Sequence, residues 1–213
     1  MFGEYQLRTQ FVKVGDTKIH MLEETEELIK YRRDNVRVIL KKSRGGFRIV
    51  PAPAEGYGVK LLLIDFEERI MIPPRETLYF YLTAPIEAEV LLGDTVVDRF
   101  QISCEKYALY GTPEIGAIAR YWRSGVYASE PESPGLIRIM ITNKTNKWME
   151  MDHVVVYIAG TVMFYSYYRA YYPLVKVEFK SDVPEVNNTG EPPREGLTPS
   201  KKPLPLPNFL MRW

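Results

Sequence analysis

The residue types best suited to binding gather in one stretch, KYALYGTPEIGAIARYWRSGVY, from Lys106 to Tyr127. After its Gly-Thr-Pro turn the side chains alternate as in a strand, which would place Arg120 and Trp122 on one face, with Arg123 just beyond. A guanidinium beside indole and phenol rings can stack on them, and its planar fork can hold a carboxylate or a phosphate. Trp, Tyr and Arg also dominate the centres of protein interfaces. We therefore predict a face that binds a protein partner or a small anionic or sugar ligand, made of Tyr110, Thr112, Arg120, Trp122, Arg123 and Tyr127.

The same stretch fits a second interpretation, an aromatic core whose arginines reach outward to solvent. Alternation alone favours neither interpretation, because it fixes which residues share a face and not whether that face is covered. Both stay open at this point.

Signatures of catalysis are missing from the sequence. It contains no phosphate-binding loop, no dinucleotide-binding glycine pattern, no nucleophile elbow and no H-E-x-x-H zinc motif. A single cysteine, Cys104, and two histidines leave little material for a metal centre. We therefore predict no catalytic residue, no cofactor and no metal site, and we favour a non-enzymatic binding module. The alternative is a hydrolase for a carbohydrate or phosphate ester, in which Glu105 or Glu114 would act beside Arg120.

Charge and hydropathy restrict the partners. Lys and Arg number 28 against 27 Asp and Glu, a net charge of +1, so we expect no nucleic acid partner. The most apolar run, from Val154 to Tyr168, is shorter than the roughly 20 residues of a membrane-spanning helix. We expect two buried strands joined or bent at Gly160 instead of a span. The first residues lack a secretory signal, which predicts a cytoplasmic protein, and few glutamines with one cysteine indicate a heat-adapted source.

The pattern of apolar residues predicts an all-β protein. Nine segments alternate with period two or are rich in β-branched and aromatic residues, and short turn signals separate them. They are residues 17–23, 36–42, 60–66, 77–83, 87–92, 96–102, 136–142, 153–159 and 175–180. This spacing is typical of an antiparallel β-sandwich, or of a barrel-like variant. The best helix candidate is EETEELIKYRR, from Glu23 to Arg33, for which a charged loop is an equal alternative.

Composition changes after Ser181. Prolines are frequent there and no strand pattern is evident, which predicts one β-rich domain over residues 1–180 and an extended Pro-rich segment over 181–213. PLPLP, from Pro203 to Pro207, favours polyproline II, a shape that docks into aromatic grooves. The last residues, NFLMRW, are costly to leave in water. We expect them to pack on their own domain or to serve a partner, self-association through this tail included.

The stretch LYGTPEIGAIARYWRSGVY resembles the characteristic segment of the archaeal family known as domain of unknown function 432. MFGEYQL, YRRDN and KLLLIDFEERIMIPP are similar to other parts of that family. The resemblance covers most of residues 1–180 and leaves the Pro-rich tail outside. It implies an archaeal, intracellular, single-domain protein, and it implies no activity, so no catalytic residue is carried over.

Overall fold

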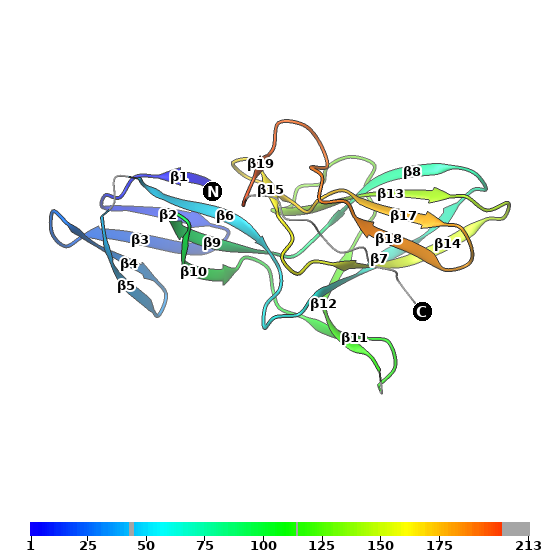
Figure 1. Cartoon of the computed structure of the whole chain (residues 1–213), viewed down its shortest axis with the longest axis horizontal. Coiled ribbons are helices and arrows are strands. Elements are labelled where there is room, and N and C mark those ends of the chain that lie inside the picture. Colours follow the sequence, from blue (N-terminus) through cyan, green and yellow to red (C-terminus); the bar gives the residue numbers. More distant parts are fainter. Residues whose placement is uncertain (43–44, 114, 202–213) are drawn as a thin grey trace.

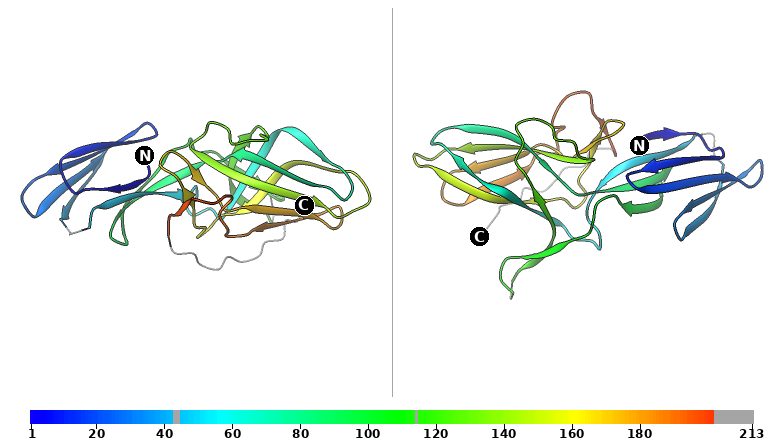
Figure 2. Two further views of the ribbon diagram at one scale, coloured as in Figure 1. Left: turned by 90° about the horizontal axis from the view of Figure 1, so that it is seen from above. Right: turned by 180° about the vertical axis from the view of Figure 1, so that it is seen from behind.

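A computed structural model describes residues 1–42, 45–113 and 115–201. These residues form strands, turns and loops and include no helix, so the predicted all-β sandwich is confirmed. The strands gather into two lobes that lie side by side along the longest axis of the molecule (Figures 1 and 2). Each lobe contains two sheets.

Two four-stranded antiparallel sheets form the first lobe. One has the order β2-β3-β4-β5, and the other has the order β1-β6-β9-β10. Their bounds are β1 Gly3–Tyr5, β2 Gln10–Val14, β3 Thr17–Glu23, β4 Leu28–Arg33, β5 Val36–Lys41, β6 Phe47–Pro53, β9 Ile86–Leu92 and β10 Thr95–Gln101. Burial alternates along β3, where Ile19 and Met21 lie in the core while Lys18 and His20 face solvent.

Mixed sheets form the second lobe. One has the order β11-β12-β7-β14, in which β12 runs parallel to β7; the other has the order β18-β17-β13-β16-β15-β19, with β8 antiparallel to β13. Their bounds are β7 Leu61–Ile72, β8 Thr77–Thr83, β11 Tyr107–Tyr110, β12 Ala117–Ser124, β13 Gly135–Asn143, β14 Met149–Tyr157, β15 Phe164–Tyr165, β16 Ala170–Tyr171, β17 Val175–Phe179, β18 Pro184–Asn188 and β19 Thr198–Pro199.

One continuous buried cluster runs through both lobes. It includes Ile19 and Ile49 of the first lobe together with Ile64 and Ile139 of the second. The lobes therefore share a core, and a polar cluster described below lies where they meet.

The helix candidate at residues 23–33 was wrong. β3 ends at Glu23, and β4 begins at Leu28. Ile29 and Tyr31 are both fully buried, so the true period is two, whereas the spacing of three between Leu28 and Tyr31 indicated a helix.

Strands also continue beyond residue 181, where no strand pattern was evident. β18 pairs with β17 and buries Val186, and β19 pairs with β15. The boundary at residues 180/181 stays a prediction. The apolar run at Val154–Tyr168 forms the end of β14 and then β15, with a turn at Gly160 between them.

Across the described ranges no helix is long and apolar enough to cross a membrane. Glu114, PLPLP and NFLMRW lie outside the described residues, and so does the tail that we expect to mediate self-association.

Candidate functional site

The predicted binding stretch forms a β-hairpin that projects from the second lobe (Figures 1 and 2). Only the inner part of β12 is held in the sheet, where Ala119 to Ser124 pair with β7; its outer part pairs with β11 alone. Thr112 closes the turn, because its carbonyl accepts a hydrogen bond of 2.6 Å from the Gly116 N–H. Tyr110 is half-buried against the core, and burial raises its pKa.

Arg120 lies at the base of this hairpin and is fully buried. Its Nη2 donates to the carbonyl oxygen of Cys104 at 2.9 Å and to that of Ser103 at 3.4 Å, and its Nη1 lies 3.5 Å from Glu105 Oε1. The Tyr107 ring covers the guanidinium, with 5.3 Å from Cζ to the ring centroid. Arg120 therefore fastens the loop before β11 to β12 and does not reach the surface.

The other predicted residues point in different directions. Trp122 is half-buried, and its Nε1 donates to Thr83 Oγ1 at 3.0 Å. Arg123 faces solvent, 3.9 Å from Asp65. Tyr127 is part of a backbone bridge to Tyr81. Since Arg120 is enclosed, the six residues do not share one open surface, and their role as a binding face stays a prediction.

The outer hairpin instead exposes apolar side chains. Leu109 and Ile118 are cross-strand partners on the face that Tyr107 shares, and Ile118 is 62% exposed. Ile115 at the tip is 86% exposed, and Tyr57 on the neighbouring loop is 90% exposed with its ring centroid 6.5 Å from that of Tyr107. Single exposed apolar residues are ordinary, but a group of them marks an interaction surface. We call these five residues the docking face.

An apolar groove of about 510 Å³ adjoins the docking face. It lies between the loop at residues 57–61 and the outer end of β12, and Lys60 is the one basic side chain among the described residues that line it. Its apolar and aromatic walls are Tyr57, Val59, Leu61, Ala117, Ile118 and Tyr157.

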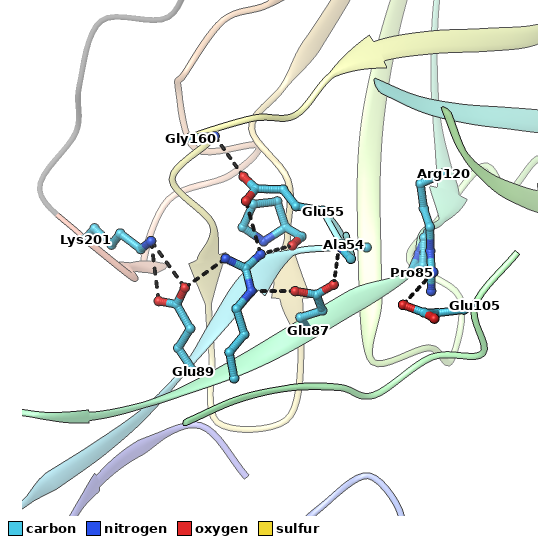
Figure 3. Close-up of polar contacts among 12 residues, drawn as sticks. Ala54, Glu55, Pro85, Glu87, Glu89, Glu105, Arg120, Gly160 and Lys201 are labelled. Atoms are coloured by element: carbon cyan, nitrogen blue, oxygen red, sulfur yellow. Dashed lines mark hydrogen bonds and ion pairs between the residues drawn. The ribbon is translucent and has the colours of Figure 1, made fainter. Parts of the chain in front are cut away.

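A polar cluster holds the loop that forms one wall of this groove (Figure 3). At its centre, Arg99 Nε lies 2.5 Å from Glu87 Oε2, its Nη1 lies 3.2 Å from Glu89 Oε1, and its Nη2 lies 3.4 Å from Glu55 Oε2. Lys201 Nζ lies 3.4 Å from the other oxygen of Glu89. Burial, the largest single effect, lowers the pKa of Arg99, but the charge and hydrogen bond of Glu87 together with the charges of Glu55 and Glu89 outweigh it and raise that pKa.

The same carboxylates also bind the backbone. Glu55 Oε1 accepts a hydrogen bond from the Gly160 N–H at 2.9 Å, and Glu87 Oε1 accepts one from the Gly56 N–H at 2.7 Å. Gly56 has φ +51°, and a Cβ there would overlap the hydroxyl oxygen of Tyr107. The loop is thus clamped between β9 and the hairpin, which fixes Tyr57 beside Tyr107.

Charge in the polar cluster is slightly negative. Glu55, Glu87 and Glu89 oppose Arg99 and Lys201, so three negative charges against two positive ones leave −1, while Lys60 stands on the wall of the groove. The Tyr107 hydroxyl donates a hydrogen bond to Glu105 Oε1 at 3.0 Å. Burial is the larger cause of the raised pKa of Tyr107, and this hydrogen bond adds to it.

Sequence reasoning missed this cluster, although a signal exists. Glu87 and Glu89 alternate with the buried residues Ala88 and Val90, so both faces of β9 are covered. Arg99 lies directly opposite Glu89 across the hairpin. A buried ion-pair network could have been predicted from this pattern, in which two acidic residues stand two positions apart and an arginine follows after a short turn.

Comparisons with known proteins identify a family. No curated protein and no solved structure matches the chain. A family described as "Protein of unknown function (DUF432)" matches residues 1–212. This confirms the resemblance and corrects its extent, because the match includes the Pro-rich segment that was expected to lie outside it. The chain therefore belongs to the DUF432 family of proteins of unknown function.

Proposed function

We propose that this protein is a non-enzymatic binding module that docks an extended, apolar protein segment on the hairpin. The observation that carries the proposal is the docking face, five large apolar side chains exposed around a projecting hairpin and beside an apolar groove. Covering each such side chain contributes about 1.5–3 kcal/mol at full burial. A small anion would bind weakly at the docking face, because the groove is mostly apolar and the neighbouring polar cluster carries a net negative charge.

The chain itself carries a segment of the right chemistry. Residues 202–213, KPLPLPNFLMRW, combine a proline-rich stretch with large apolar residues, and Lys202 and Arg212 add positive charge. Proline-rich segments bind aromatic-lined grooves, and Tyr57, Tyr107 and Tyr157 supply such rings. The negative charge of the polar cluster complements the two cations.

The place at which the described chain ends favours this occupant. Lys201 is paired with Glu89, and Glu89 shares Arg99 with Glu55, which stands two residues before Tyr57. Twelve residues in extended form reach about 40 Å, so the segment can arrive at the docking face of its own chain. Docking on a second copy would make the same contact a route to self-association.

A peptide-binding experiment tests the proposal. A fluorescent peptide of residues 201–213 is titrated into a chain ending at Lys201, which keeps every described residue. We expect saturable binding that Ile118→Asp weakens about tenfold or more, because a buried apolar contact is replaced by a charge. Ile39→Asp is the matched control, since Ile39 is 64% exposed on β5 in the other lobe. Equal affinity of the two variants, or no binding at all, would refute the proposal.

Hydrolysis is the second candidate, and one observation favours it. Glu105 does lie beside Arg120, and it lines a groove of about 480 Å³ together with Glu87. However, both oxygens of Glu87 already accept hydrogen bonds and Arg120 is enclosed, so neither is free to act on a substrate. Hydrolysis of p-nitrophenyl glycosides or p-nitrophenyl phosphate that is lost in Glu105→Gln would favour the enzyme instead.

Source and location remain predictions within this proposal. Composition supports a heat-adapted source, the family resemblance implies an archaeal one, and the cytoplasmic location stays a prediction. The balanced net charge supports a protein partner over nucleic acid.

A further inference from the structure

A second cavity, of about 580 Å³, lies in the other sheet of the second lobe. The turn between β15 and β16 forms one wall, with Ser166, Tyr168 and Arg169. Residues 132–134, before β13, and Arg194 complete it. It shares no lining residue with the groove at the hairpin.

One carboxylate organises the polar groups of this cavity. Glu130 Oε2 lies 3.1 Å from Arg169 Nη1 and accepts a 2.8 Å hydrogen bond from the Tyr171 hydroxyl. Glu130 Oε1 lies 3.0 Å from Arg194 Nε, and Arg194 Nη2 donates to the Tyr171 oxygen at 3.1 Å. The two guanidinium groups are thus held in fixed positions while both side chains stay partly exposed. Each keeps N–H donors to spare, since a guanidinium has five.

The charges decide which class of ligand fits. Arg169, Arg194 and Glu132 line the cavity, and Glu130 is paired with both arginines, so two positive and two negative charges leave no net charge. A free anion would gain from the arginines and lose to Glu130 by a similar amount. A neutral ligand with several hydroxyl groups can instead donate to the exposed carboxylate of Glu132 and accept from the guanidinium groups.

An aromatic surface stands beside these groups. Tyr168 is 73% exposed, and Tyr167 packs edge-on against it with ring centroids 4.6 Å apart. An exposed ring offers a flat apolar surface on which the C–H face of a sugar ring can lie, while its hydroxyl groups turn toward polar neighbours.

We propose that this cavity binds a neutral carbohydrate. The sugar hydroxyls contact Arg169, Arg194 and Glu132, all of which line the cavity, and one sugar ring packs on Tyr168. This site is separate from the docking face, and the proposal does not rest on the proposed function.

Saturation-transfer NMR on the full chain tests it. The probes are maltose and cellobiose, with glucose 6-phosphate and inorganic phosphate as charged comparisons. We expect transfer to the ring protons of at least one disaccharide, and an affinity that falls about fivefold in Tyr168→Ala, as the loss of one aromatic contact implies. Phe11→Ala, at an exposed aromatic residue on β2 of the first lobe, should leave that affinity unchanged.

Three results would overturn the proposal: no transfer to either disaccharide, tighter binding of glucose 6-phosphate or phosphate than of the disaccharides, or an equal loss of disaccharide affinity in Tyr168→Ala and Phe11→Ala. Because Tyr168 is mostly exposed, its replacement should leave folding intact, and a denaturation curve of the variant checks this.

Discussion

Gly56→Ala should destabilise the protein more than its near neighbour Gly58→Ala. Both glycines have positive φ, +51° and +85°, so each alanine costs about 1–2 kcal/mol of backbone strain. At Gly58 no described atom lies within 4 Å of the added Cβ, so that variant reports the backbone cost alone. At Gly56 the Cβ overlaps the Tyr107 hydroxyl and lies 3.2 Å from Glu105 Oε1.

The additional cost follows from what Tyr107 must give up. If its ring moves away, the 3.0 Å hydrogen bond to Glu105 is lost, which costs about 1 kcal/mol. The contact of the ring with Arg120 weakens as well, by about 0.5–1 kcal/mol. Gly56→Ala should therefore lower the free energy of unfolding by about 1–2 kcal/mol more than Gly58→Ala does.

Guanidinium chloride denaturation of both variants, alone and combined with Tyr107→Phe, measures the free energies of unfolding. Removing the hydroxyl removes the overlap, so Gly56→Ala should cost less in the Phe background than in the wild type, whereas Gly58→Ala should cost the same in both. Equal costs for the two glycines, or no coupling between residues 56 and 107, would show that the loop is not clamped against the hairpin.

Two further predictions concern buried polar groups. Glu87→Gln should lower the free energy of unfolding by about 1–2 kcal/mol, because the ion pair with Arg99 is lost and one of the two accepting oxygens becomes an NH2 donor. Glu68→Gln, at an exposed position, should change it by less than about 0.5 kcal/mol in the same denaturation assay. If Glu87→Gln lowers the free energy of unfolding as little as Glu68→Gln does, the ion-pair network around Arg99 does not stabilise the fold as we expect. Burial and the neighbouring Tyr167 raise the pKa of Tyr5 to about 12, above the ordinary value of 10.0. The unfolded chain therefore loses this proton first, and stability should fall as pH rises from about 10 to 12; a Tyr5→Phe variant with the same alkaline profile as the wild type would contradict this.

Local alternation was sufficient to predict most of the fold. Residues 136–142 show why, since Ile137, Ile139 and Ile141 are all fully buried in β13. β6 was missed because its prolines argue against an inner strand. The pairing of β6 with β1 ends at Ile49, and Pro51 and Pro53 come after it. In that part of the strand β6 pairs with β9 and not with β1, so it is open on one side and tolerates the two prolines.

The candidate site was only partly predictable, for a different reason. Period two correctly placed Arg120 and Trp122 on one strand face, but whether that face is open depends on the loop at residues 102–106, which covers Arg120. Leu109 and Ile118 are exposed because β7 begins its pairing at Leu61, opposite Ala119, and leaves the outer hairpin without support on that side. Both facts depend on segments distant in sequence, so no local pattern contains them.

Hydrogen exchange tests the central claim most directly. Exchange at residues 57–61 and 107–118 is compared between the full chain and a chain ending at Lys201, with light scattering to give the molecular mass of each. Our account predicts slower exchange of both segments in the full chain, with a monomer mass if the segment docks on its own copy and a larger mass if it docks on another. Identical exchange in the two chains would contradict docking of residues 202–213 on the hairpin.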